Sequence, residues 1–233
     1  MTVELIDHMG NDLSVVNAAR VSFDKESDWE TIPFGGPTEG VLQDKDIKLI
    51  KYLAKHNHWT PFGHGSAQFR IKAPIFVARQ LMKHQVGLVW NEVSRRYIKT
   101  DPDFWSPDYW RQSAEDVKQG SSREAVASPS VINHMFEDAQ RHCEDAYKAM
   151  IGSGVCAEQA RAILPQSLLT EWYWSGTLMA FARVYKLRCS KDAQVETSDV
   201  VKPIGDHMEK LFPESWSAYV EVSVEKGVGR CGA

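Results

Sequence analysis

A cluster of positive charge in the middle of the chain is the sequence feature that most constrains its fold. Residues 65–99 contain seven Lys and Arg side chains and one acid, Glu92, which gives a local charge of +6 in a chain of net charge −4. Mutual repulsion makes such crowding costly unless an anion neutralises it. The polar side chains that accompany the cations suit a nucleotide site: Gln80, His84, Asn91, Glu92 and Ser94. We therefore expect a fold that gathers this segment around a bound anion.

Size and composition favour a single domain that spans residues 1–233. The chain is 43% apolar and contains eight Trp, which is enough for a substantial core. A net charge of −4 argues against a dedicated nucleic-acid partner. No apolar run reaches the roughly 18–20 residues of a membrane span, and the first residues lack the features of a secretory signal. We expect a protein with neither a nucleic-acid nor a membrane partner.

The four cysteines are scattered, with no Cys-x-x-Cys pair: Cys143, Cys156, Cys189 and Cys231. This spacing predicts free thiols in a reducing cytoplasm, rather than a disulfide framework or a zinc site. His56, His58 and His64 lie close together in sequence, but no acidic or cysteine ligand nearby completes a metal set. We therefore expect a cytoplasmic protein without a metal centre.

The hydrophobic pattern predicts an α+β fold with few strands and many helices. Residues 1–23 are typical of a strand, a turn and then a short helix or strand, and residues 66–72 and 171–174 are typical of strands. Residues 24–40 and 100–130 read as loops. Helical spacing occurs in six further segments, the last of them interrupted at Pro203: 44–57, 74–86, 131–151, 157–164, 178–187 and 193–212.

The basic segment favours phosphate binding. Arg79 and Lys83 are four residues apart on the helix predicted over 74–86, so they project together. No Gly-rich phosphate loop occurs, and a dinucleotide is therefore expected to bind without a Rossmann fold. Ser94 lacks the Gly-x-Ser-x-Gly setting of a nucleophile. Arg188 precedes Cys189 and a cation lowers the pKa of a neighbouring thiol, yet an inert Cys189 is the better interpretation.

Several motifs resemble the flavin-dependent thymidylate synthase family, ThyX. Its signature is Arg-His-Arg, seven residues and Ser, usually continuing to Arg-Tyr. This chain has Lys83-His84-Gln85, eight residues, and then Ser94-Arg95-Arg96-Tyr97. Four further stretches are similar to the family in order and spacing: 58–64, 73–80, 160–165 and 186–196. The resemblance implies a ThyX-like α+β fold, in which a small, mostly antiparallel sheet packs with several helices.

The resemblance also implies an activity, the conversion of dUMP to dTMP. In that reaction methylenetetrahydrofolate supplies the carbon, FAD carries the reducing hydride, and NADPH reduces the flavin. Both dUMP and FAD are anionic, which fits the basic segment. The family is homotetrameric, with each site assembled from several subunits. A homotetramer with shared active sites is therefore implied for this chain.

The family's ligand contacts fall on specific positions of this sequence. Those for dUMP are Gln80, Glu92, Ser94, Arg95, Arg96, Arg161 and Arg188. Those for FAD are His58, Thr60, Lys83, His84, Gln85, Asn91, Glu92 and Arg183. By resemblance, Arg188 is the catalytic group, which contacts the uracil ring and stabilises charge as C5 becomes nucleophilic. Arg96 and Arg161 anchor the nucleotide, and Ser94 binds phosphate rather than attacking.

Two departures from the family pattern affect the flavin site. Lys83 keeps the charge of the expected arginine but loses its forked geometry, and Gln85 loses the charge as well. Weaker flavin phosphate binding is expected unless Arg79 or Arg183 compensates. One alternative is a nucleotide-binding regulatory module that retains the dUMP pocket without turnover. A third hypothesis is a thiol-dependent uracil methylase that uses Cys189.

Overall fold

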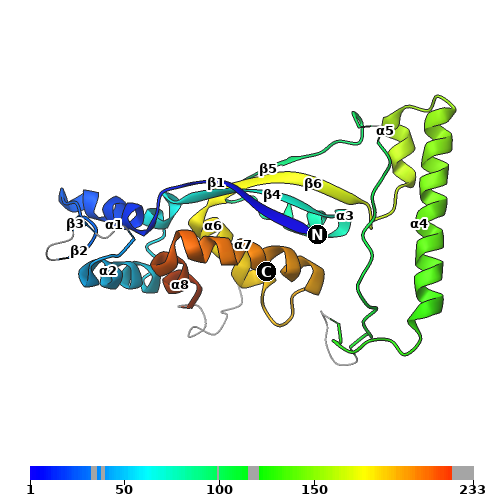
Figure 1. Ribbon diagram of the computed structural model, residues 1–233. Coiled ribbons are helices and arrows are strands. Elements are labelled where there is room, and N and C mark those ends of the chain that lie inside the picture. Colours follow the sequence, from blue (N-terminus) through cyan, green and yellow to red (C-terminus); the bar gives the residue numbers. More distant parts are fainter. Residues whose placement is uncertain (33–35, 38–39, 99, 115–120, 222–233) are drawn as a thin grey trace, which may run out of the picture.

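A four-stranded antiparallel sheet forms the centre of the protein, with the strand order β1-β4-β6-β5 (Figure 1). The computed structural model describes residues 1–32, 36–37, 40–98, 100–114 and 121–221. The strands are β1 (Thr2–Met9), β4 (Ser66–Pro74), β5 (Leu88–Glu92) and β6 (Leu169–Thr177). This sheet and its helices confirm the α+β prediction. Parts of the predicted loops, Lys99 and Cys231 lie outside the described residues.

One face of the sheet carries the core. Phe69 of β4 pairs in register with Trp174 of β6, and both are fully buried. Trp172 lies on the same face, whereas Arg70 and Tyr173 alternate with these residues and are exposed. Because successive side chains of a strand face opposite sides, the alternation gives the sheet one buried and one open face. Each large apolar side chain buried there contributes about 1.5–3 kcal/mol.

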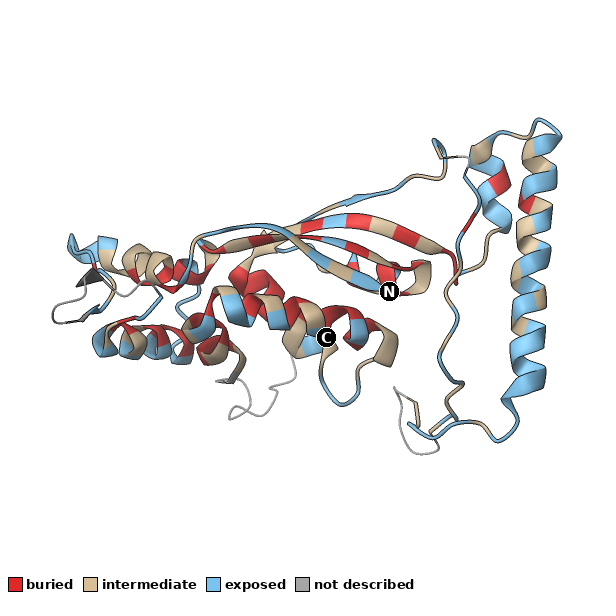
Figure 2. Cartoon of the chain, in the orientation of Figure 1, coloured by how far each residue is buried: buried red, intermediate tan, exposed pale blue. Residues whose placement is uncertain are grey.

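Helices cover the buried face of the sheet (Figures 1 and 2). They are α6 (Leu178–Arg188) and α7 (Val195–Leu211), while α8 (Pro213–Glu221) packs against α6, α7 and α2 (Asp44–Lys55). The predicted interruption at Pro203 is wrong, because α7 continues through it. Val200, Val201 and Ile204 around the proline are buried, and this packing maintains the helix although Pro lacks a backbone donor.

Helix α8 did not appear in the sequence prediction. It begins at Pro213, and proline suits the first helical position. The Asp12 carboxylate accepts hydrogen bonds from the backbone N–H groups of Glu214 and Ser215, at 2.8 and 2.9 Å. A carboxylate about 200 residues away thus caps this helix, a contact that no local pattern encodes.

The N-terminal helices lie at one end of the sheet (Figure 1). α1 (Asp12–Arg20) begins after Asn11, which forms a capping box with Ser14, and α2 (Asp44–Lys55) confirms the helix predicted over 44–57. The connections contain four short elements: η1 (Val21–Phe23), β2 (Thr31–Ile32), β3 (Gly36–Pro37) and η2 (Thr60–Gly63). The predicted 24–40 loop therefore includes a short antiparallel pair.

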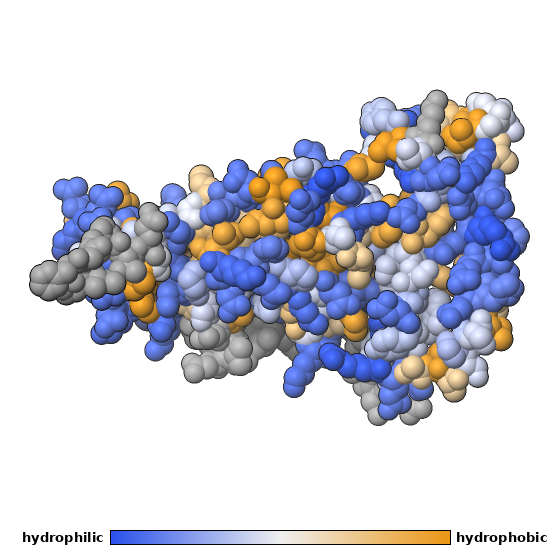
Figure 3. Space-filling view, viewed as in Figure 1, coloured by the Kyte–Doolittle hydropathy of each residue, from blue (hydrophilic) through white to orange (hydrophobic). Residues whose placement is uncertain are grey.

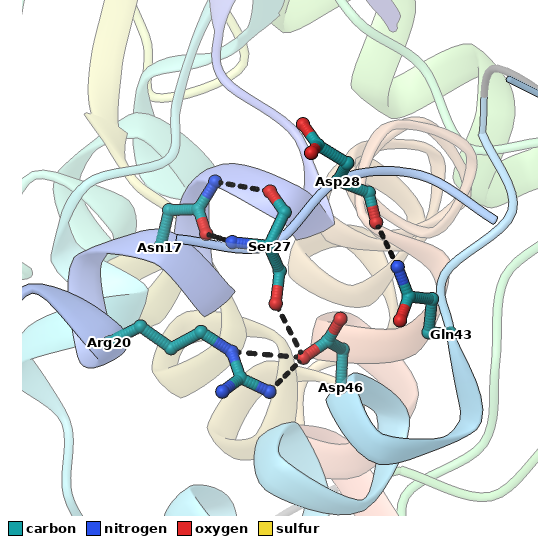
Figure 4. Close-up of polar contacts among 6 residues, drawn as sticks. All are labelled: Asn17, Arg20, Ser27, Asp28, Gln43 and Asp46. Atoms are coloured by element: carbon teal, nitrogen blue, oxygen red, sulfur yellow. Dashed lines mark hydrogen bonds and ion pairs between the residues drawn. The ribbon is translucent and has the colours of Figure 1, made fainter. Parts of the chain in front are cut away.

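A partly buried ion pair joins α1 to α2 (Figure 4). The Arg20 guanidinium donates to Asp46 Oδ1, from Nε at 3.0 Å and also from one terminal nitrogen. Ser27 Oγ donates to the same oxygen at 3.1 Å, and Asn17 makes two hydrogen bonds to the Ser27 backbone. The Asp46 side chain is fully buried, so its negative charge depends on these partners.

The basic segment enters the fold through α3 (Ile75–Leu81). The sequence predicted a helix over 74–86, but the helix ends at Leu81. Gly87, at φ +76°, turns the chain so that β5 can pair with β6, and residues 82–87 form this connection. As a result Lys83 and His84 lie beyond the helix, and Lys83 does not share a helix face with Arg79.

A long helix stands at the other end of the molecule (Figure 1). α4 (Pro129–Gly152) lies beside α5 (Ala157–Ala160) and η3 (Arg161–Ile163), which confirms both helices predicted there. Tyr147 is its buried residue, and Figure 3 shows a mostly hydrophilic surface over this helix. The predicted 100–130 loop runs along the start of β6, where the Leu169 N–H donates to the Asp103 carbonyl at 2.8 Å.

Candidate functional site

A cavity of about 280 Å³ gathers three of the predicted dUMP-binding residues. Glu92 is the last residue of β5, Arg95 follows it, and Arg161 comes from η3. Lys72 of β4, one of the seven cations of the basic segment, and Glu171 of β6 also line the cavity, although neither was predicted as a ligand contact. Arginine binds phosphate through paired hydrogen bonds, and a carboxylate accepts hydrogen bonds from a sugar or a base. This set of side chains can therefore bind a phosphorylated nucleoside.

Two neighbouring residues fix the Glu92 carboxylate. Thr170 of β6 donates its hydroxyl to Oε1 at 2.7 Å, and Trp90 Nε1 donates to Oε2 at 3.3 Å. The Trp90 ring stacks on the buried Trp172 ring, with 4.4 Å between the ring centroids. The sequence did not lead us to Thr170. A polar residue two positions before Trp172 lies on the buried face of β6, and this position could have indicated a buried hydrogen bond.

The two cavity arginines differ in how firmly they are held. Arg95 donates to the carbonyl oxygens of Thr100 and Asp101, at 2.5 and 3.3 Å, which fixes its guanidinium beside the cavity. Arg161 Nε donates to the Glu158 carbonyl at 3.3 Å, and the side chain remains exposed. Arg161 is thus the more accessible cation for an incoming anion.

Ser94 and Arg96 form a pair next to this cavity without lining it. Arg96 Nε donates to Ser94 Oγ at 3.2 Å, and its Nη1 lies 4.0 Å from Glu158 Oε1. The exposed Arg96–Glu158 contact is a weak ion pair at this distance. The Ser94 hydroxyl contacts a cation rather than a general base, an arrangement that suits anion binding.

A second group of predicted residues meets where α3 and the end of α6 approach α7. Arg188 Nε donates to His84 Nε2 at 2.9 Å, and Thr197 Oγ1 donates to Gln80 Oε1 at 2.8 Å. Burial, and then the positive charge of Arg188, lower the pKa of His84 below its ordinary value of 6.5. The imidazole is therefore neutral at neutral pH, which allows Nε2 to accept the arginine hydrogen bond.

The predicted flavin-binding residues do not share one place in the chain. His58 and Thr60 line a separate cavity of about 750 Å³ formed by α1, α2 and η2, together with the aromatic rings of Tyr52 and Trp59. Four further members are exposed around the turn after α3, on β5 and on α6: Lys83, Gln85, Asn91 and Arg183. The last two, His84 and Glu92, belong to the groups already described, because His84 contacts Arg188 and Glu92 lines the smaller cavity. Arg79, the suggested compensating cation, is exposed on α3.

The predicted site residues therefore form separate groups in one chain. Glu92, Arg95 and Arg161 line one cavity, and His58 lines another that shares none of these residues. Arg188 lines neither cavity. The family resemblance predicts that all of these residues surround two adjacent ligands. A single chain brings only some of them together.

The structure argues against a reactive Cys189. Burial is the main cause that raises the pKa of this thiol, to about 11, so the thiolate is scarce at neutral pH. Cys143, Cys156 and Cys189 are free thiols, as the sequence predicted. Within the part of the chain that the structure describes, no three His, Cys, Asp or Glu side chains are grouped as metal ligands. No helix in that part has the length and apolar character required to span a membrane.

The fold matches solved structures of a nucleotide methylase. A UMP/dUMP methylase, PolB from Streptomyces cacaoi, bound with 5-Br UMP, matches with a TM-score of 0.80 and 28% identity. The match covers 95% of this chain and 94% of PolB. PolB bound with 5-Br dUMP matches with a TM-score of 0.79, covering 94% of each chain.

Sequence relatives identify the family. The family model described as thymidylate synthase complementing protein matches residues 4–214. A flavin-dependent thymidylate synthase of Thermus thermophilus is 34% identical over 96% of this chain and 77% of its own length. That of Wolbachia pipientis wMel is 33% identical over 99% of this chain and 78% of its own length. The chain belongs to the flavin-dependent thymidylate synthase family of methyltransferases, which confirms the resemblance seen in the sequence.

Proposed function

We propose that this protein catalyses the reductive methylation of dUMP to dTMP. Methylenetetrahydrofolate is the carbon donor, and FAD that NADPH has reduced is the source of hydride. The observation that carries the proposal is the cavity lined by Glu92, Arg95 and Arg161. Family membership supports it, and so does the likeness to a methylase whose solved structures contain 5-Br UMP and 5-Br dUMP.

The charges around the cavity fit dUMP. Arg161 and Arg95 bind its phosphate, with the Ser94–Arg96 pair as a further anchor. Glu92, oriented by the Thr170 hydroxyl, accepts a hydrogen bond from the nucleoside. Because Thr170 and Trp90 already fix the carboxylate, little side-chain freedom is lost when the ligand binds.

Arg188 is the proposed catalytic residue. Before C5 of uracil can attack a one-carbon unit, negative charge must develop on the ring, and a guanidinium that contacts the ring stabilises it. The bond to the neutral His84 fixes Nε of Arg188 and leaves the terminal nitrogens for the substrate. The route needs no enzyme thiolate, in agreement with the raised pKa of Cys189.

The side chains around the larger cavity and the exposed cations near α3 and α6 fit FAD. His58, Tyr52 and Trp59 present rings at the larger cavity, which suits a planar aromatic ligand. The exposed cations Lys83 and Arg183 suit a diphosphate, and Gln85 and Asn91 supply neutral hydrogen bonds. When bound, reduced FAD supplies the hydride that completes the methyl group.

The separation of these groups supports shared active sites. We extend the proposal to a homotetramer in which Arg188 of one copy and the Glu92 cavity of another serve the same substrate. The whole chain acts as a single domain in the cytoplasm, where dUMP, folate and NADPH are supplied. Light scattering after size-exclusion chromatography tests the tetramer, and a monomer with full activity contradicts it.

Tritium release from dUMP labelled at C5 tests the activity. We expect a yellow protein whose tritium release requires FAD, NADPH and methylenetetrahydrofolate together. Arg161→Ala is expected to weaken dUMP binding, whereas the control Arg141→Ala, on the exposed face of α4, is expected to leave it unchanged. Binding of dUMP without FAD binding or turnover would favour the regulatory module instead. A colourless protein that cannot be reconstituted with FAD contradicts the proposal.

A further inference from the structure

Two consecutive hydroxyls in the first turn of α7 contact two of the residues that the family resemblance predicts to bind dUMP. Thr197 Oγ1 donates to Gln80 Oε1 at 2.8 Å, and Ser198 Oγ donates to the carbonyl oxygen of Arg188. Thr197 is fully buried, with 0% of its surface exposed. No sequence motif pointed to either residue, and the proposed reaction does not require either to touch a substrate.

The hydrogen bond from Thr197 holds the Gln80 amide with its oxygen toward α7. A glutamine amide has an oxygen that accepts and a nitrogen that donates, and the two ends are nearly equal in shape. Thr197 has one hydroxyl proton and gives it to Oε1, so the amide oxygen faces α7. The Nε2 group, with its two N–H donors, is thereby turned away from α7. The opposite rotamer would present an acceptor to an anionic ligand.

We infer that Thr197 is a positioning residue, which presents the Nε2 donors of Gln80 to an acceptor oxygen of the bound nucleotide. The inference rests on the proposed function, because it takes Gln80 as a dUMP contact. Thr197 acts only through Gln80. Since Gln80 is half-buried, its amide can rotate and take up water when the hydroxyl is removed. The loss therefore falls on nucleotide affinity more than on folding.

Replacement of Thr197 by Val tests the inference, because the two side chains have nearly the same shape. We expect the dissociation constant for dUMP, measured by calorimetry on the FAD-loaded protein, to rise about two- to tenfold. This is the change that corresponds to the loss of one hydrogen bond. Thr197→Ser keeps the hydroxyl and is expected to bind dUMP with the affinity of the unaltered protein. Gln80→Glu keeps an acceptor for Thr197 but removes both donors, so a larger rise is expected even if Thr197→Val proves unstable.

Two controls separate positioning from a general loss of stability. Ser27→Ala removes another buried hydroxyl, which donates to Asp46 between α1 and α2, and is expected to lower the melting temperature without changing dUMP affinity. In a Gln80→Ala background, Thr197→Val is expected to cause no further loss of affinity.

Three outcomes overturn the inference. Unchanged affinity in Thr197→Val removes the orienting role. If Thr197→Val lowers dUMP affinity equally in the unaltered protein and in the Gln80→Ala background, Thr197 acts through the fold alone. If the unaltered protein does not bind dUMP, the proposed function fails, and the inference fails with it. This result can be told apart from the first two, because both of those require that the unaltered protein binds dUMP normally.

Discussion

Replacement of Arg188 by Ala is expected to separate substrate activation from folding. Arg188 is the last residue of α6, and its carbonyl oxygen accepts the Ser198 hydroxyl. Alanine keeps this carbonyl and removes the side chain beyond Cβ, with the guanidinium that donates to His84. The imidazole is half-buried, and water can replace the lost donor. The free energy of unfolding should therefore fall by no more than about 1 kcal/mol, the scale of one hydrogen bond.

The effect on the reaction should be larger than the effect on stability. A hydrogen bond from a charged group contributes about 1.5–3 kcal/mol, which corresponds to roughly a tenfold to hundredfold loss of kcat/KM for dUMP. Arg188 is also the second cause, after burial, of the lowered pKa of His84. Without the arginine, this pKa should rise part of the way toward 6.5, because burial remains.

Three measurements on one preparation test this reasoning. Tritium release gives kcat/KM, the flavin absorbance gives the FAD content, and an NMR titration of His84 gives its pKa. Arg141→Ala is the matched control, since Arg141 is exposed on α4 and its partner is Asp138. FAD content and melting temperature should remain close to those of the unaltered protein in both variants.

Two results would refute the argument. Loss of FAD or of folding together with activity would show that Arg188 is structural. Full kcat/KM in Arg188→Ala would remove this residue from the mechanism. An unchanged pKa of His84 would separately show that the His84–Arg188 contact does not persist in solution.

Three further predictions follow from buried groups. Cys189→Ala should retain full tritium release, because burial keeps the thiol protonated; loss of turnover in a folded variant would revive the thiol-dependent mechanism. Protonation of His84 should weaken affinity for dUMP as the pH falls through the lowered pKa of this imidazole, since the protonated ring cannot accept from Arg188. A dissociation constant that stays flat across the acidic range contradicts this. Arg20→Ala should cost about 3–5 kcal/mol in urea unfolding, because it leaves the buried Asp46 carboxylate without its cation; a cost below about 1 kcal/mol would show that this ion pair contributes little to stability.

The sequence by itself determined the elements with strong local periodicity and the identity of the family. The helix over 44–57 and the strand over 66–72 appear within a few residues of their predicted bounds. Apolar spacing encodes such elements directly, since each depends on neighbours in the chain. The motifs around His84, Ser94 and Arg161 identified the family because a ligand constrains residue types at fixed spacing.

Tertiary structure alone decided where these elements end and which side chains meet. The α3 helix ends at Leu81, because the chain turns there so that β5 can pair with β6. Helix α7 continues through Pro203, because the residues around this proline are buried. Thr197 lies 117 residues from Gln80, and Thr170 lies 78 residues from Glu92, yet each pair forms a hydrogen bond. Such contacts depend on how the sheet and the helices pack in three dimensions, and the local pattern around either residue carries no information about its partner.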